Sequence, residues 1–312
     1  MKKYVLFLIF LLMIVTILLR PQSIYNATNP LSYIKNKDYH FIFIPKEEND
    51  YWDKISKGIV VSANENNVSV SILKINYFNK EKHLSRIDRA IESDCDGIIS
   101  YTLNDNDYKN LVNKSIERNI PFITIDGDVL DSKRNAYIGI NHYYAGNMMA
   151  EKLFEVLNDH GEIGLIMSSE ENTLRLTGIY NKANEYEKIN IIDVSYMDEK
   201  KVNTYKIIED MVIKNKNIKG IICNDEYSTY LAGQVLVRLN KVGKIKIIGM
   251  GGMQGTKRFV QKGVIEGVFI KNPYSLGNKA IESIIDIKKG NFVEDAVFDD
   301  LLYIDKENLD EE

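Results

Sequence analysis

The sequence has few of the residues that build disulfide frameworks and metal sites. Its 312 residues include two cysteines, Cys95 and Cys223, and four histidines. Each cysteine lies beside an apolar run, and the pair has no metal-ligand spacing, so we expect two unbridged, core-filling thiols. The histidines are scattered, with no Cys, His or Glu cluster near them. We therefore expect no metal site and no cofactor.

An excess of positive charge and flexible linker composition are also absent. The formal net charge is −4 and the sequence pI about 5.8. A nucleic-acid partner would require a basic face, so we expect none. Five prolines and no long Ser/Gly tract leave little room for a flexible linker between domains. With 45% hydrophobic residues, the chain is long enough for two globular domains of roughly 130 residues each.

Common catalytic motifs are missing. The sequence contains no Gly-x-Ser-x-Gly elbow and no zinc-binding helix, and Gly249-Met-Gly-Gly lacks the spacing and the lysine of a phosphate-binding loop. Dispersed carboxylates leave an enzyme as an alternative. Without a nucleophile and a base in view, however, we expect a binding protein and not an enzyme.

The N-terminus breaks the globular pattern. Two lysines precede an apolar run, residues 4–19, which Arg20 and Pro21 close. As a helix this run spans about 24 Å, short of the roughly 30 Å hydrocarbon core, but its flanking cations can snorkel. No small-residue cleavage site follows it. We therefore expect a signal anchor at residues 1–21 and a stalk at 22–37, in preference to a cleaved signal. In both cases the folded body is extracytoplasmic.

After the stalk, apolar runs alternate with segments of helical spacing. The run Pro121–Ile125 leads into Asp126 and Gly127, which is typical of a buried parallel strand that ends in a loop. Ligands of open α/β sheets bind outside the carboxyl ends of the strands, so Asp126 is a candidate ligand contact. The alternation restarts near residue 162 and predicts a second α/β half.

The boundaries follow the apolar patterns. Strands are expected at 39–45, 68–75, 97–101, 121–126, 135–140, 162–167, 191–194, 220–223, 245–249, 263–270 and within 292–304. Helices are expected at 52–64, 84–91, 108–118, 144–157, 173–187, 202–213, 228–239 and 275–288.

Four motifs in this order resemble the periplasmic sugar-binding proteins of the ribose/galactose type, over residues 38–304. They are Ile-Pro-Phe-Ile-Thr-Ile-Asp126, Arg175-x-x-Gly178, Asn224-Asp-Glu and Asn272-Pro-Tyr-x-x-Gly277-x-x-Ala280. The resemblance implies an α/β fold of two Rossmann-like lobes with parallel sheets, three crossing segments and a ligand cleft between the lobes. The expected N-terminal lobe is 38–140 plus 271–298, and the C-terminal lobe is 141–270 plus 299–312.

The resemblance also implies binding residues in the first lobe. Asn49, Tyr51 and Trp52 match an asparagine and two aromatic residues that hydrogen-bond to and stack on a sugar, whose C–H face suits a flat ring. Asp126 matches a carboxylate that accepts sugar hydroxyls. The alternatives are that the two aromatic residues pack on their own lobe and that Asp126 forms a turn before Gly127.

Three further residues are implied in the second lobe. Arg175 matches an arginine whose planar fork donates to two vicinal oxygens, and its alternative is a surface helix position. Asn224 offers a donor and an acceptor to a hydroxyl, and its alternative is a helix N-cap. Lys271 stands where ribose-type proteins carry glutamine, and it either meets an acidic group of the ligand or pairs with Asp126.

Two departures from the ribose pattern argue against ribose as the ligand. Gly127 replaces an arginine and Gly251 replaces an aspartate. Each lost charged hydrogen bond costs about 1.5–3 kcal/mol. Joint removal of opposite charges leaves room for a larger or modified sugar.

The expected function is that of a membrane-tethered, extracytoplasmic carbohydrate-binding protein for an ABC sugar importer. The alternative is a sensor partner of a histidine kinase in the same membrane, which the short stalk favours because it keeps the body near the bilayer. A sugar-responsive repressor shares the two-lobe core, but its helix-turn-helix head is absent.

Overall fold

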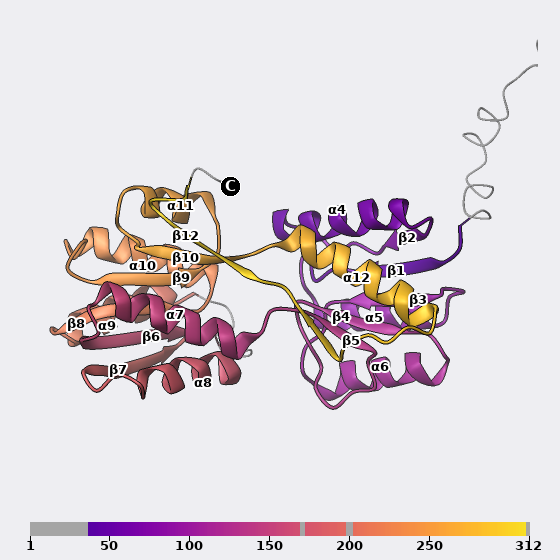
Figure 1. Cartoon of the computed structure of the whole chain (residues 1–312), viewed down its shortest axis with the longest axis horizontal. Coiled ribbons are helices and arrows are strands. Elements are labelled where there is room, and N and C mark those ends of the chain that lie inside the picture. Colours follow the sequence, from indigo (N-terminus) through magenta and orange to yellow (C-terminus); the bar gives the residue numbers. More distant parts are fainter. Residues whose placement is uncertain (1–36, 169–171, 198–201, 310–312) are drawn as a thin grey trace, which may run out of the picture. The chain divides into compact units, whose positions relative to one another are not determined.

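A computed structural model describes residues 37–168, 172–197 and 202–309 (Figure 1). The predicted anchor and nearly all of the predicted stalk lie outside these ranges. Within them, every helix is too short or too polar to cross a bilayer.

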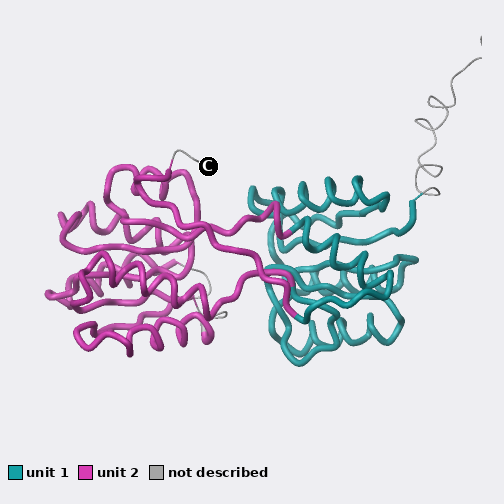
Figure 2. Tube along the Cα trace, viewed as in Figure 1, with its two compact units in different colours: residues 1–137, 277–295 teal, residues 138–276, 296–312 magenta. Residues whose placement is uncertain are grey.

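The chain forms two compact α/β units (Figure 2). The first unit runs to Tyr137 and includes Gly277–Asp295, and the second comprises Ile138–Leu276 and the chain from Ala296 onward. The chain therefore passes between the units three times. Each unit contains one six-stranded sheet. The predicted class, two α/β halves built on mainly parallel sheets, is confirmed.

The first sheet has the strand order β11-β5-β4-β3-β1-β2. Its β1 pairs in parallel with β2 and β3, and β3 pairs in parallel with β4. Every residue of β3 and β4 is buried, as expected for parallel strands with helices on both faces. The strands are β1 (His40–Ile44), β2 (Ser69–Ile72), β3 (Gly97–Ser100), β4 (Phe122–Ile125), β5 (Ala136–Gly139) and β11 (Ala296–Phe298), and the helices of this part are α4 (Asp50–Glu65), α5 (Lys80–Ile91), α6 (Asn106–Glu117) and α12 (Pro273–Lys288).

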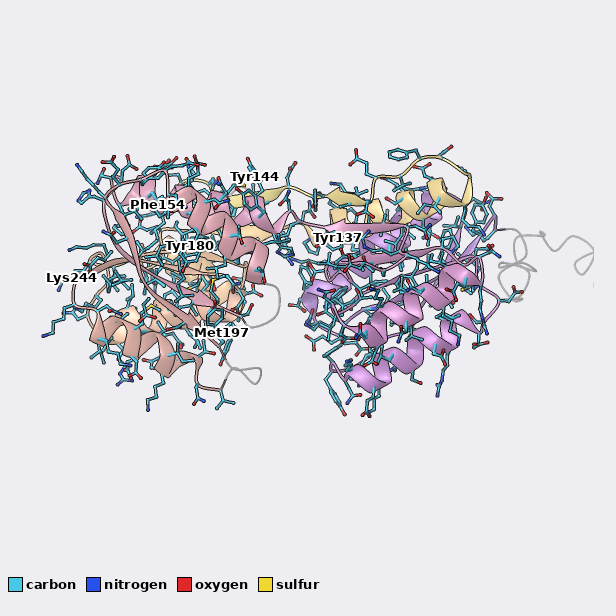
Figure 3. The ribbon with its side chains drawn as sticks, turned by 90° about the horizontal axis from the view of Figure 1, so that it is seen from below. Tyr137, Tyr144, Phe154, Tyr180, Met197 and Lys244 are labelled. Atoms are coloured by element: carbon cyan, nitrogen blue, oxygen red, sulfur yellow. The ribbon has the colours of Figure 1, made fainter. Side chains whose placement is uncertain are left out.

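The second sheet has the order β12-β10-β9-β8-β6-β7, and only its β10–β12 pair is antiparallel among the pairings described. Phe154 is fully buried in its core, whereas Tyr144 is 59% exposed (Figure 3). The strands are β6 (Gly161–Met167), β7 (Ile189–Tyr196), β8 (Ile218–Cys223), β9 (Lys246–Met250), β10 (Gly267–Lys271) and β12 (Leu301–Asp305), and the helices are α7 (His142–Val156), α8 (Asn172–Ala183), α9 (Thr204–Lys214), α10 (Glu226–Arg238) and α11 (Gln254–Gln261).

Several element boundaries differ from the predicted ones, and two differences have a clear physical reason. Helix α11 was not predicted, because its eight residues bury only Thr256 and Val260 and give too short a periodic signal. The predicted strand 263–270 begins only at Gly267, since Gly263 adopts a φ of +66° and turns the chain.

Both cysteines are free thiols, Cys223 buried and Cys95 half-buried, so the prediction of unbridged cysteines is confirmed. In the described part of the chain, no three Cys, His, Asp or Glu side chains gather as a metal site would require.

Candidate ligand-binding site

The loop after β1 places Tyr51 and Trp52 in the first turn of α4. Asn49 is the N-cap of this helix, and its side-chain oxygen accepts a hydrogen bond from the Trp52 N–H at 3.0 Å. Its Nδ2 donates to Glu47 Oε1 at 3.0 Å. Asn49 is exposed, so capping fixes the start of the helix at the surface of the first unit.

Tyr51 and Asp126 meet at the carboxyl ends of β1 and β4. The Tyr51 hydroxyl donates to Asp126 Oδ1 at 2.7 Å. Asp126 has a φ of +65°, and the N–H of Gly127 donates to the Ile125 carbonyl at 2.8 Å, which defines a γ-turn. Aspartate and asparagine adopt this left-handed region more readily than other residues that carry a side chain. Asp126 therefore forms the turn before Gly127 that was considered as its alternative role. In this turn its carboxylate lies within hydrogen-bond distance of the Tyr51 hydroxyl.

Trp52 is 3% exposed and packs within the first unit. Its ring lies edge-on to Tyr51 at 5.7 Å and to Tyr101 at 5.8 Å, and tilted against Phe43 at 6.3 Å. The packing alternative therefore describes Trp52 in this structure, where it supports the Tyr51 ring. Its contact with a ligand stays a prediction.

Arg175 lies on α8, where that helix closely approaches α7. A Cβ at Gly146 would collide with the Arg175 carbonyl oxygen, and a Cβ at Gly178 would collide with the Tyr143 carbonyl oxygen. Only glycine allows this approach, which gives the Arg175-x-x-Gly178 motif its physical meaning. Arg175 is 4% exposed, so the alternative of a surface helix arginine is wrong.

The Arg175 guanidinium links two elements of the second unit. Its Nη1 donates to the Asn224 carbonyl oxygen at 2.5 Å, and its Nη2 lies 2.7 Å from His142 Nδ1. Because a guanidinium only donates, His142 accepts at Nδ1 and carries its ring proton at Nε2. His142 was not predicted as a site residue. Its place in the sequence could have suggested it, because His142 lies shortly after the end of β5, just as Asp126 lies directly after the end of β4.

Asn224 lies just after β8 and is 2% exposed. Its Oδ1 accepts from the Ser168 N–H at 3.0 Å, which ties the ends of β6 and β8 together. Helix α10 is capped instead by Asp225, which accepts from the N–H groups of Tyr227 and Ser228 at 2.9 and 3.2 Å. The N-cap alternative for Asn224 is therefore wrong.

Lys271 is the last residue of β10 and is half-buried. Asp126 belongs to the other unit, so their pairing and the reading of an acidic ligand group by Lys271 both stay predictions.

The two departures from the ribose pattern are fixed by local packing. A Cβ at Gly127 would collide with the Thr102 carbonyl oxygen and come within 2.5 Å of Tyr101 Cε2. Gly251 has a φ of +98°, and a Cβ there would lie 2.8 Å from the Cα of Glu226. In this backbone conformation neither position accepts the arginine or the aspartate of the ribose pattern.

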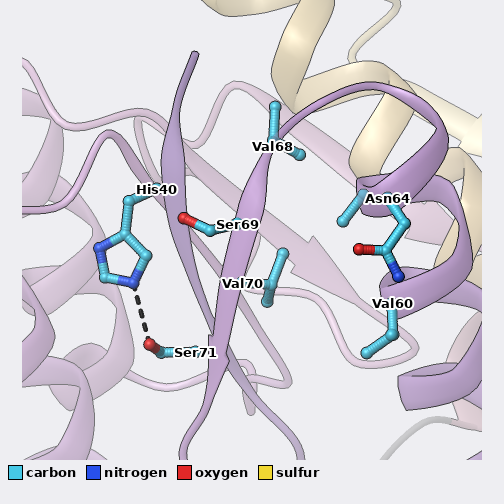
Figure 4. Close-up of a pocket in the computed structure, with 8 residues that line it drawn as sticks. His40, Val60, Asn64, Val68, Ser69, Val70 and Ser71 are labelled. Carbon is cyan, nitrogen blue, oxygen red and sulfur yellow. Dashed lines mark hydrogen bonds between the residues drawn. The ribbon is translucent and has the colours of Figure 1, made fainter. Parts of the chain in front are cut away.

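A surface pocket lies elsewhere on the first unit, against β2 and the second half of α4 (Figure 4). Beside it, His40 Nε2 lies 2.9 Å from Ser71 Oγ. Its lining contains no carboxylate and no predicted binding residue, so it is not the candidate site. The lining residues are His40, Val60, Ala63, Asn64, Val68, Ser69, Val70 and Ser71.

Comparison with known proteins identifies the class. A family model described as a periplasmic binding protein domain matches residues 41–291, and the chain belongs to this family. Membership implies an extracytoplasmic location.

Two of the similar proteins are named for the sugars that they bind. The D-allose-binding periplasmic protein of Escherichia coli (strain K12) is 20% identical over 257 residues, which cover 78% of this chain and 83% of the relative. GanP, a glucose-galactose binding protein from Geobacillus stearothermophilus, has a similar structure with a TM-score of 0.80, 26% identity and coverage of 87% of this chain and 98% of GanP. The structure of a XylFII-LytSN complex has a TM-score of 0.75 and 23% identity, with coverage of 86% and 98%. The first two relatives are named as sugar-binding proteins, which supports a role without catalysis at the family level.

Proposed function

We propose that the protein is an extracytoplasmic carbohydrate receptor that reversibly binds a monosaccharide-like ligand. The observation that carries the proposal is the hydrogen bond from the Tyr51 hydroxyl to Asp126 Oδ1 at 2.7 Å. A sugar hydroxyl presents the same donor to a carboxylate, and the adjacent Tyr51 ring provides a flat apolar face for sugar C–H groups. Asn49 lies in the same loop and adds amide hydrogen-bonding groups.

The second unit contributes charge and fixed donors. Arg175 and Asn224 are both buried and hydrogen-bonded to each other, so their geometry is set before a ligand arrives. Lys271 adds a second cation from the end of β10. The proposed mechanism is closure of the two lobes on the ligand. Ligand contacts to residues of both lobes would stabilise the closed form relative to the open form.

The leading role for this receptor is delivery of the ligand to an ABC importer in the membrane to which residues 1–21 anchor it. The second candidate is a sensor partner of a membrane histidine kinase. The similarity to one member of a two-protein complex supports the idea that a protein of this fold can act through a protein partner. Co-purification of the liganded receptor with a permease or with the extracytoplasmic part of a kinase separates the two roles.

The receptor itself is tested by a thermal-shift screen of the full chain in detergent. The panel contains pentoses, hexoses, inositols, sugar acids and sugar phosphates, with amino acids as the control class. A ligand at a hundred times its Kd adds about 2.7 kcal/mol to the free energy of unfolding and raises Tm by several degrees. A folded protein that no sugar stabilises contradicts the proposal.

A further inference from the structure

Lys46 holds its charge in an unusual setting in the first unit. Its Nζ lies 4.7 Å from the ring centroid of Tyr101 and 5.3 Å from that of Phe78. Both distances are within the range of a cation–π interaction. Over the described residues, no carboxylate or other hydrogen-bond partner accompanies this ammonium group. The ring faces hold the amine but leave its charge without a counterion.

The neighbouring carboxylate is engaged elsewhere. Glu47 Oε1 accepts from Asn49 Nδ2 at 3.0 Å, and its Oε2 accepts from the Phe78 N–H at 3.3 Å. These two bonds fix the loop after β1 and engage both carboxylate oxygens of Glu47, and among the described residues no ion pair joins Glu47 to Lys46. In this loop, Glu47 therefore stabilises the backbone and the Asn49 side chain, while the Lys46 ammonium group lies over the two aromatic rings.

Lys46 lies at the same sheet edge as the proposed sugar contacts. It follows the end of β1 by two residues, and Tyr101 is the first residue after β3. The Tyr101 ring lies so close to Gly127 that a Cβ there would come within 2.5 Å of Cε2, and Gly127 directly follows Asp126. One aromatic ring thus separates the Lys46 ammonium from the turn that presents the Asp126 carboxylate.

We propose that Lys46 binds a negative charge on the ligand, so that the receptor takes an anionic sugar, with a carboxylate or a phosphate as the charged group. This inference deepens the proposed function and rests on it. An ammonium group has three N–H donors, and a carboxylate or phosphate accepts them in charge-assisted bonds. A half-buried cation without a counterion favours such a ligand over a neutral one. Asp126 accepts hydroxyl groups at the same edge, and its own charge directs the ligand anion toward Lys46.

The test is calorimetric titration of the full chain with matched sugars. Each pair joins a neutral sugar to its charged form: galactose with galacturonate, glucose with glucuronate, and glucose with glucose 6-phosphate. The uronates test a carboxylate and the phosphosugar tests a phosphate. The variants are Lys46→Met, Lys46→Arg and the control Lys57→Met, which removes an exposed lysine of α4.

The expected result is tighter binding of one charged sugar than of its neutral partner. Lys46→Met weakens that binding at least tenfold and reduces its dependence on salt, while Lys46→Arg restores most of it and Lys57→Met leaves it unchanged. Affinity for the neutral partner falls less in Lys46→Met than affinity for the charged sugar does, and it is unchanged in Lys57→Met.

Two results overturn the inference and leave the receptor in place. One is a neutral sugar that binds at least as tightly as its acid and its phosphate, and the other is a charged sugar that Lys46→Met binds as tightly as Lys57→Met does. Absence of binding to every sugar by the folded protein overturns the receptor, and the inference with it.

Discussion

Arg134 binds Asp128 through two nitrogen atoms, Nε to Oδ1 at 2.5 Å and Nη2 to Oδ2 at 2.8 Å. Asp128 lies two residues after Asp126 and also accepts from Thr124 Oγ1 at 2.8 Å. The Nη1 of Arg134 reaches the Asp295 carbonyl oxygen at 2.8 Å, just before the chain passes into the second unit. One guanidinium thus fixes both the loop after β4 and a crossing segment.

Substitution Arg134→Met should lower the free energy of unfolding by about 3 kcal/mol, because it leaves the carboxylate of Asp128 partly buried and uncompensated. The Arg134 side chain is only 8% exposed and that of Asp128 18%. The control is Arg118→Met, whose ion pair with Glu92 is 44% and 50% exposed, and we expect a much smaller loss there because solvent screens the pair. Urea denaturation measures both. Equal losses in the two variants would show that the Arg134 pair is no more than a surface contact.

The carboxylate of Asp126 is best tested with asparagine. Asparagine tolerates the φ of +65° found at this position, whereas alanine would add backbone strain to the loss of charge. We expect Asp126→Asn to weaken sugar binding at least tenfold, with little change in Tm. The control Asp107→Asn removes an exposed carboxylate of α6 and should bind normally. Titration of the two variants with the sugar found by screening decides the point, and normal binding by Asp126→Asn would remove this residue from the site.

The sequence was sufficient for the fold because its buried strands carry continuous apolar runs. Strand β4 is fully buried, and the lone carboxylate after it pointed to Asp126 at the strand end. What the sequence could not supply is the partner of each polar group. Nothing in the order of residues shows that Tyr51, 75 positions away, donates to Asp126.

Asn224 and Asp225 illustrate the same limit at shorter range. Both residue types cap helices well, and sequence spacing did not separate them. The structure gives the cap to Asp225 because the chain leaves β8 one residue earlier, where Asn224 is buried between strand ends. The choice depends on tertiary packing and not on local propensity.

Arg175 should not tolerate a lysine, although the charge is kept. Lysine has one amine in place of the fork that reaches both His142 and the Asn224 carbonyl. We expect Arg175→Lys to lower the free energy of unfolding by about 2 kcal/mol, the value of one hydrogen bond to a charged group, and to weaken sugar binding. The exposed Arg258 of α11 provides the control Arg258→Lys. Denaturation and titration measure the two effects, and wild-type values for both would show that the fork is not needed.

His83 makes stability depend on pH. It is fully buried on α5, and its Nδ1 lies 3.1 Å from the Tyr108 hydroxyl. Burial lowers the pKa of His83 from 6.5 to about 4, with the charges of Arg86 and Lys46 acting in the same direction and the carbonyls of Pro45 and Ile44 opposing. The imidazole is therefore neutral in the folded protein over a range where the unfolded chain is protonated.

Because the unfolded state binds more protons between pH 6.5 and 4, the contribution of His83 is complete above pH 6.5 and is lost as the pH falls toward 4. At about 1.4 kcal/mol for each pH unit, the loss approaches about 3 kcal/mol. We expect His83→Gln to flatten the dependence of unfolding free energy on pH in this window by that amount, whereas His160→Gln, at an exposed histidine, should leave it as in the wild type. Denaturation curves at half-unit pH steps measure the slopes. An unchanged slope in His83→Gln would mean that this imidazole is already protonated in the folded protein.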